Sequence, residues 1–258
     1  MSRCTRLWIG LIAAIGLSFA VLGYLGRYHA TASFAEGAPP PYAKAQSTMV
    51  GAPAPDNAVV LFNGEHLSNW TKREGEPAVW RIEDGAMTPA GGDIMTKETF
   101  TDFYLHLEFR TPDMPEATGQ AKGNSGVYLA GRYEIQVLDS YGWEVPGMGD
   151  CGAMYGQYAP LVSACKPALE WQAYDVVFRA ARLDESGKVR ERVRVTVLQN
   201  GIVIHNNVEL PGVTAGAIDD KEGMPGPLLL QDHGHPVQYR NIWIVPLPLQ
   251  GSDEYGPR

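Results

Sequence analysis

The most constraining feature of this sequence is an alternation of apolar and polar side chains with a period of two. It is clearest in residues 103–110, where apolar side chains from Phe103 to Phe109 alternate with polar ones from Tyr104 to Arg110. This period predicts a β-strand with one apolar and one polar face, because successive side chains point to opposite faces. Similar runs occur at 127–138, 174–179 and 193–198, and no segment has a helical period. Many short strands joined by Gly and Pro predict an all-β sandwich.

The N-terminus has the pattern of an export signal. Arg3 and Arg6 precede an uncharged apolar run from Leu7 to Leu25, and Ala30-Thr31-Ala32 offers a cleavage site. The run is also long enough to remain as an uncleaved anchor. We therefore expect residues 1–32 to be a signal peptide or anchor, and the protein to be periplasmic or extracellular. Contact with a membrane is expected only through this segment.

The remaining chain divides by composition. Residues 33–57 are rich in Ala, Pro and Gly and are expected to be a linker. Residues 58–248 show no break or internal repeat and are interpreted as a single domain, followed by a tail at 249–258. The net charge of -8, from 29 acidic and 21 basic residues, argues against nucleic acid as a partner.

Cysteine usage fits export. Removal of the leader would take Cys4 with it and leave Cys151 and Cys165. An even number of cysteines in an exported chain predicts a disulfide between them.

Several polar side chains occupy positions where a strand face would carry them together. On residues 133–137 the alternation puts Glu134 and Gln136 on one face, opposite Tyr133, Ile135 and Val137. If the other polar strands are neighbours, that face also holds the following residues: Arg110, Gln231, His233 and Arg240. A solvated sheet face is usually rich in Lys, Thr, Ser and Glu. This set instead combines Gln, His and Arg with carboxylates, which favours a functional face over a merely wet one.

At this point the sequence resembles the 3-keto-disaccharide hydrolase domain family. The pieces that carry the resemblance occur in order: Leu61–Trp70, Leu107–Arg110, Gly123–Tyr128, Tyr133–Asp139, Gly152–Tyr155, Glu170-Trp171, Asn200-Gly201, Leu230–Gly234 and Tyr239–Ile242. The resemblance implies a concanavalin-A-like jelly-roll sandwich and action on sugars oxidised at carbon 3. Some members are described as metal-assisted lyases.

The chemistry implied by the resemblance starts from the ketone at C3, which acidifies the C2 proton. A base removes that proton, the C1 substituent leaves by β-elimination, and addition of water completes a net hydrolysis. The roles expected here are His233 as base, Glu134 as acid for the leaving group, and Arg110 or Arg240 as stabiliser of the enolate. A divalent metal held by Glu134, Gln136 and His233 is an alternative stabiliser. The residues expected to contact the oligosaccharide or glycoside substrate are Gln136, Asn124, Asp139, Gln231, Arg240 and Tyr155.

Two alternatives remain open. A retaining glycosidase of the laminarinase type would need the carboxylate pattern Glu-x-Asp-x-x-Glu, whose equivalents here are Glu134, Gln136 and Asp139. The amide at Gln136 departs from that pattern, and strict alternation puts Asp139 on the opposite face unless a bulge rotates it. A lectin-like binding module would use the same groove and aromatic residues without a base.

Overall fold

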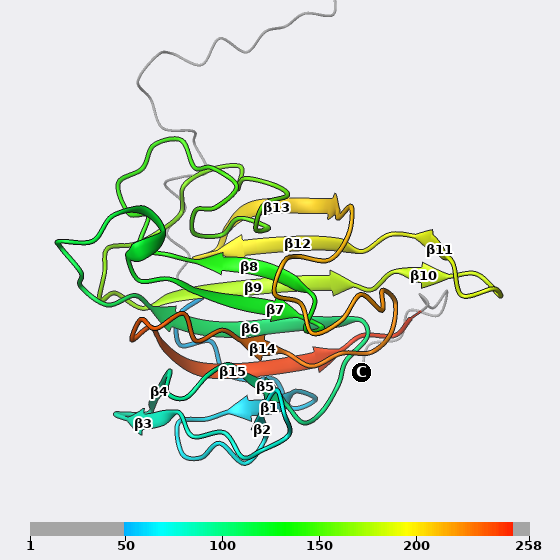
Figure 1. Ribbon diagram of the computed structural model, residues 1–258, viewed down its shortest axis with the longest axis horizontal. Helices are drawn as coiled ribbons and strands as arrows, with labels where there is room; N and C mark the ends of the chain where they lie inside the picture. The colour runs from blue at the N-terminus through cyan, green and yellow to red at the C-terminus, as the bar shows by residue number, and fades with distance from the viewer. Residues whose placement is uncertain (1–48, 250–258) are drawn as a thin grey trace, which may run out of the picture. The chain divides into compact units, whose positions relative to one another are not determined.

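The computed structural model describes residues 49–249, which form a jelly-roll β-sandwich (Figure 1). The all-β prediction is confirmed, and within this range the helical element is a 3-10 turn, η3 (Gly119–Ala121). The predicted leader, residues 33–48 of the predicted linker and residues 250–258 of the predicted tail lie outside the described residues. No helix between residues 49 and 249 is both long and apolar enough to cross a membrane.

The larger sheet has eight antiparallel strands in the order β13-β12-β9-β6-β15-β4-β3, with β1 paired to β15 as well. Its strands are β1 (Val59–Phe62), β3 (Arg81–Glu83), β4 (Ala86–Thr88), β6 (Phe103–Arg110), β9 (Gln172–Arg179), β12 (Arg194–Gln199), β13 (Ile202–Glu209) and β15 (Gln238–Pro246).

The smaller sheet has five strands in the order β2-β5-β14-β7-β8. Its strands are β2 (Trp70–Lys72), β5 (Ile94–Thr96), β7 (Ser125–Leu129), β8 (Tyr133–Val137) and β14 (Leu229–Leu230). A separate pair, β10 (Arg182–Leu183) and β11 (Val189–Glu191), forms a two-stranded ribbon.

The alternation read from the sequence builds the core between the sheets. Phe103, Leu105, Leu107 and Phe109 of β6 are all buried. Across the core, the Tyr133 ring of β8 lies 5.7 Å from the Phe178 ring of β9. The Tyr174 hydroxyl of β9 donates a 2.7 Å hydrogen bond to the Gln136 carbonyl of β8. Inward side chains of each sheet therefore contact the other, and the polar side chains of β8 point outward.

Glycine-containing turns close the hairpins where the sequence predicts them. Asn200 and Gly201 join β12 to β13 with φ values of 55° and 79°. Two consecutive residues with positive φ suit the twist of a two-residue hairpin, and Asn-Gly adopts them at low cost.

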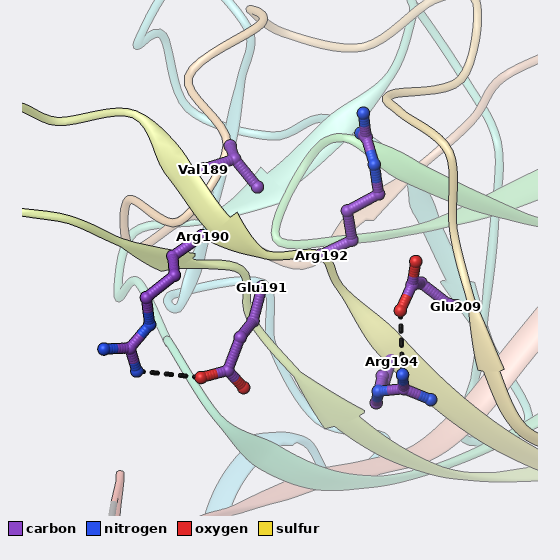
Figure 2. Close-up of a pocket in the computed structure, with 6 residues that line it drawn as sticks. All are labelled: Val189, Arg190, Glu191, Arg192, Arg194 and Glu209. Carbon is purple, nitrogen blue, oxygen red and sulfur yellow. Dashed lines mark hydrogen bonds and ion pairs between the residues drawn. The ribbon is translucent and has the colours of Figure 1, made fainter.

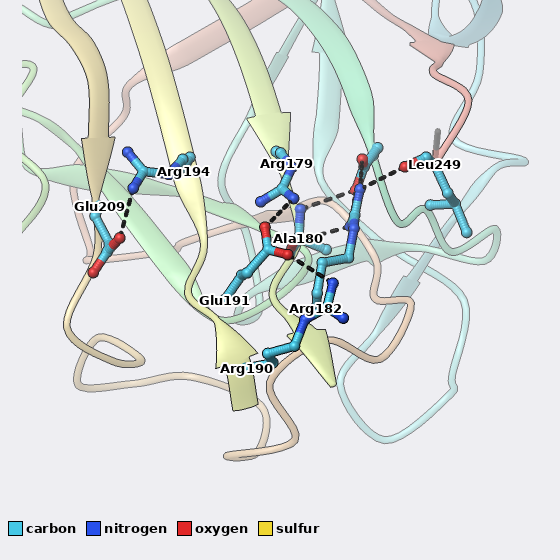
Figure 3. A network of polar contacts seen from close by, with 9 residues as sticks. Arg179, Ala180, Arg182, Arg190, Glu191, Arg194, Glu209 and Leu249 are labelled. Carbon is cyan, nitrogen blue, oxygen red and sulfur yellow. Dashed lines mark hydrogen bonds and ion pairs between the residues drawn. The ribbon is translucent and has the colours of Figure 1, made fainter. Parts of the chain in front are cut away.

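The charged segment between β9 and β12 is the β10–β11 ribbon, which projects from one end of the sandwich (Figure 1). Figure 3 shows how ion pairs hold its base. Arg179 pairs there with Glu191 at 2.5 Å. Arg182 donates to the Asp102 carboxylate at 2.9 Å and 2.5 Å. The clustered arginines are therefore largely matched by carboxylates.

The outer face of β6 is largely shielded from solvent. His106 and Glu108 are fully buried there, because residues 49–52 lie across it. The Gly51 amide donates to Glu108 at 2.6 Å, and Asn241 donates to the Ala52 carbonyl at 2.9 Å. The end of the predicted linker is thus part of the folded domain.

The structure does not contain the disulfide predicted between Cys151 and Cys165. Cys151 and Cys165 are both free thiols. Cys151 also lies 3.3 Å from the Tyr174 hydroxyl, and Cys165 donates to the Lys166 carbonyl at 3.5 Å. A hydrogen bond with Cys151 is the main reason that the pKa of Cys165 is raised well above its usual value. Spacing and compartment could not reveal that both thiols are used as hydrogen-bonding groups within the domain.

The buried Glu108 carboxylate should make stability depend on acid pH. Burial alone would raise its pKa, but hydrogen bonds from His106, Asn241, the Gly51 amide and Arg240 lower it to about 2. A lowered pKa stabilises the folded state above the unfolded value of 4.5, and this contribution is lost as pH falls from there to about 2. Its size is at most roughly 3 kcal/mol.

We expect Glu108→Gln to unfold more easily at neutral pH and to lose less stability than wild type between about pH 4.5 and 2. Urea titrations at several pH values measure this. His106, whose usual pKa is 6.5 and is raised in the fold, is protonated in both states throughout that range. Parallel pH profiles for the two proteins would contradict the assignment.

Candidate functional site

The outer face of the smaller sheet carries a continuous band of polar side chains. Its centre is the pairing of β7 with β8, in which Tyr128 lies opposite Glu134 and Gly126 lies opposite Gln136. Directly opposite residues share a face, so all four belong to the side that points away from the core. We call Asp93, Tyr128, Glu134, Gln136 and Asn124 the polar band.

Glu134 is the buried carboxyl at the centre of the polar band, with 3% of its surface exposed. It accepts a 2.9 Å hydrogen bond from the Tyr128 hydroxyl. Burial raises its pKa to about 7, the Tyr128 hydrogen bond lowers it, and the negative charge of Asp93 raises it. A carboxyl with this pKa exchanges a proton readily at neutral pH, which is what a general acid or base requires.

A glycine makes room for this carboxyl. A side-chain carbon added at Gly126 would lie 2.4 Å from Oε1 of Glu134. Real atoms do not approach so closely, so any larger residue at position 126 would displace the Glu134 carboxyl or the strand. The sequence Asn-Ser-Gly-Val-Tyr therefore supplies both the space and the hydroxyl partner for Glu134.

The loop of residues 212–226 covers the polar band at β7 and β8. The Thr214 hydroxyl accepts from the Glu134 amide at 3.1 Å, and the Ala215 carbonyl accepts from Tyr128 at 2.9 Å. Arg132, just before β8, holds this loop through a 2.5 Å ion pair with Asp219. The loop keeps Glu134 away from bulk water and so contributes to its raised pKa.

Amide side chains gather at the other end of the polar band. The Gln136 amide lies 3.0 Å from Oε1 of Gln120 and 3.4 Å from Oδ1 of Asn124. In the opposite amide orientation its nitrogen would lie 3.3 Å from Oε1 of Glu134. Nearby, the backbone N–H of Gln231 donates to the Gly126 carbonyl. The side-chain Oε1 of Gln231 is buried and has no hydrogen-bond partner among the described residues. Such an acceptor is ready for a donor from a ligand or water.

Two predicted site residues lie elsewhere. Arg110 and Arg240 belong to β6 and β15 of the larger sheet, on the face that points away from the polar band. The prediction that they share a face with Glu134 is wrong. It assumed that all polar strands belong to one sheet, whereas β6 and β15 pair with each other and β7 and β8 form part of the second sheet.

The remaining predicted residues take mainly structural positions. Asp139 pairs with Lys122 at 3.0 Å, and the Tyr155 backbone amide donates to the Glu134 carbonyl at 3.1 Å. His233 is exposed in the turn after β14, with its ring 5.9 Å from that of His235. His235 contacts the polar band directly, because its Nδ1 accepts a hydrogen bond from the backbone N–H of Asn124 at 2.9 Å.

The residues of the predicted metal set come from two places. Glu134 and Gln136 share a face of β8, whereas His233 lies in the exposed turn after β14. Between residues 49 and 249, no three His, Cys, Asp or Glu side chains form a group suited to a metal ion. A divalent metal held by Glu134, Gln136 and His233 stays a prediction.

Sequence reasoning missed Tyr128, Asp93, Arg73 and Gln120. Asp93 sits beside β5, where it pairs with Arg73 at 2.8 Å and accepts from the Asp232 amide. Tyr128 was within reach, since it follows Gly126 by two residues and so shares its face. Asp93, Arg73 and Gln120 come from short or irregular segments without periodicity, and no local signal marks them.

A surface pocket of about 300 Å³ lies beside the β10–β11 ribbon (Figure 2). Its lining residues are Val189, Arg190, Glu191, Arg192, Arg194 and Glu209. The charges pair within the pocket: Arg190 with Glu191 and Arg194 with Glu209, each at 2.8 Å. These exposed pairs contribute little energy. Hydrogen bonds from Arg179 and Arg190 lower the pKa of Glu191 and keep it ionised.

The two-sheet jelly roll with an outward polar band defines a concanavalin-A-like fold used by carbohydrate-related proteins. Residues 57–245 match the model of the 3-keto-α-glucoside-1,2-lyase-like domain. The chain therefore belongs to that family, and the resemblance seen in the sequence is confirmed.

Solved structures support the same fold. A candidate glycosyl hydrolase from Parabacteroides distasonis is 40% identical, with a TM-score of 0.70, over 75% of this chain and 85% of that one. A second from the same organism is 22% identical, with a TM-score of 0.55, over 74% and 94% of the two chains. The second likeness supports the fold alone. No curated protein matches the chain.

Substitutions of Tyr128 and Asp93 should shift the pKa of Glu134 in opposite directions. Tyr128→Phe removes the hydrogen bond that lowers the pKa, so we expect a value above 7. Asp93→Asn removes the negative charge that raises it, so we expect a lower value. A carbon-13 NMR titration of the glutamate carboxyls measures both, with Glu134→Gln to assign the resonance. Shifts of the same sign in the two variants would contradict this electrostatic account.

Proposed function

We propose that this chain cleaves 3-keto-glycosides, with Glu134 as the group that moves the proton. The observation that carries the proposal is the buried Glu134 carboxyl, which has a pKa of about 7. It lies on a polar sheet face of a 3-keto-α-glucoside-1,2-lyase-like domain. An ordinary surface carboxylate would be too weak a base for a carbon acid.

The reaction follows from the acidity of the proton next to the ketone. Ionised Glu134 takes the C2 proton, and the electron pair of the C–H bond forms the enolate of the C3 ketone. The enolate then expels the C1 oxygen substituent, giving a C1=C2 double bond conjugated with the ketone. Glu134, now neutral, returns the proton to the leaving oxygen. Addition of water across the double bond puts hydroxyl on C1 and hydrogen on C2, which completes a net hydrolysis.

Groups in and around the polar band have supporting roles in this proposal. The Gln136 amide is an uncharged donor on the same face as Glu134, and it suits the developing negative charge on O3. The buried, unpartnered oxygen of Gln231 suits a sugar hydroxyl. The 212–226 loop excludes water, which strengthens each of these interactions.

This assignment replaces the base expected from the sequence. His233 is exposed and makes no described contact with the polar band, whereas Glu134 is at its centre. Arg110 and Arg240, on the other sheet, do not take part. The segment 1–32 supports export of the enzyme, so we place the reaction in the periplasm or outside the cell.

Substitution of Glu134 and His233 should separate the two candidate bases. We expect Glu134→Gln to lower kcat/KM on a p-nitrophenyl 3-keto-α-glucoside by about 10²–10⁴-fold, because it removes the general base. His233→Ala should retain activity within about threefold of wild type, since only an exposed ring is lost. A reversed pattern would transfer the role of base to His233. Glycoside binding with no turnover in wild type would support a lectin-like module instead.

The pH profile and isotope effect provide an independent check. We expect kcat/KM to increase with pH up to about 7 and then level off, because the ionised carboxyl is the base. Deuterium at C2 should slow the reaction, and the parent glucoside without the ketone should not be cleaved. Equal rates on the parent glucoside would point to a conventional glycosidase.

A further inference from the structure

Arg110 and Arg240 lie on the larger sheet, away from the polar band, and both contact the ring of Trp171. The guanidinium carbon of Arg240 lies 4.0 Å from the centre of the Trp171 ring, and that of Arg110 lies 4.8 Å from it. All three side chains are half-buried. They come from β15, β6 and the residue before β9, three adjacent strands of the larger sheet.

Both guanidinium groups are fixed in place at one nitrogen. Nε of Arg240 donates to Glu108 at 2.7 Å, and Nε of Arg110 donates to Gln238 at 2.5 Å. The indole ring restricts them further through cation–π contact. For each, no described residue accepts a hydrogen bond from the terminal nitrogens, so these donors are held ready without a protein partner.

The charges at this cluster are unequal. Glu108 neutralises Arg240, but Arg110 pairs with a neutral amide and forms no ion pair within residues 49–249. Lys166 adds a further positive charge nearby, since its Nζ donates to the Trp171 carbonyl at 3.2 Å. Glu170 is adjacent in sequence but exposed. The arginines around the β10–β11 ribbon differ, because Arg190 and Arg194 each have a carboxylate partner (Figure 2).

A planar fork of N–H donors matches a carboxylate better than it matches any uncharged group. A ligand carboxylate would give Arg110 the partner that Glu108 gives Arg240. Since the family and its structural relatives are carbohydrate-related, a carboxylate on a sugar is the fitting source. We propose that Arg110, Trp171 and Arg240 bind the carboxylate of an acidic glycan, at a site separate from Glu134.

Isothermal titration calorimetry of the full-length protein with tetragalacturonate tests this site. The fully methyl-esterified tetrasaccharide is the matched ligand, because it has the same sugars without the charge. We expect wild type to prefer the charged form and to bind it more weakly at high salt. Arg110→Gln should weaken binding of the charged form about tenfold, the usual effect of losing a charge-assisted pair, and leave the ester unaffected.

Three further variants locate the site. Arg240→Lys keeps a positive charge beside Glu108 but loses the planar fork, so it should also weaken binding without unfolding the domain. Arg190→Gln, on the β10–β11 ribbon, and Glu134→Gln should bind as wild type does. Equal affinity of wild type for both ligands would overturn the proposal, as would unchanged binding in Arg110→Gln. Loss of binding in Glu134→Gln alone would place the acidic sugar in the polar band instead. Failure of cleavage by wild type would leave this site unaffected.

Discussion

The register of the β7–β8 hairpin is the constraint on which the candidate site depends. It sets Tyr128 opposite Glu134 and Gly126 opposite Gln136, and so brings together hydroxyl, carboxyl and the space for both. Ala130 and Gly131, with φ values of 50° and 68°, form the turn that fixes it. A slip by one residue would exchange the two faces, burying Glu134 in the core and exposing Ile135. The apolar contacts of Tyr133 and Ile135 in the core therefore also keep Glu134 on the outer face of the sheet.

Loops outside the hairpin then determine how acidic Glu134 is. A strand side chain that faces water would keep an ordinary pKa, but the 212–226 loop covers this one. Gly216 is part of that cover: its φ is +83°, and an added side-chain carbon would lie 2.7 Å from the Tyr128 hydroxyl. The glycine thus permits the backbone of the loop to approach Tyr128 closely. The proton affinity at β8 depends in this way on a segment about 80 positions away in the sequence.

Much of the fold was predictable because periodicity is a local signal. The alternation on β6 and the Asn-Gly turn after β12 directly reflect backbone geometry, and both predictions are confirmed. The Glu134 and Gln136 face was predictable for the same reason. Sheet membership was not, since nothing in residues 103–110 indicates whether β6 pairs with β7 or with β15. That non-local choice separated Arg110 and Arg240 from Glu134, and it also buried Glu108 under residues 49–52.

The strand that carries Glu134 is the last in its sheet, yet its outer edge is occupied. Its backbone forms three hydrogen bonds along that edge. The backbone N–H of Gln136 donates to the Ala153 carbonyl, and the backbone N–H of Gly152 donates to the Gln136 carbonyl. The backbone N–H of Tyr155 donates to the Glu134 carbonyl. A bare edge strand is a template for another extended chain, whether from a second copy or from an unfolded neighbour. The short segment after Cys151 takes up those hydrogen bonds. Access to Glu134 along the strand edge is thereby closed, and an incoming molecule must approach from above the sheet, past the covering loop.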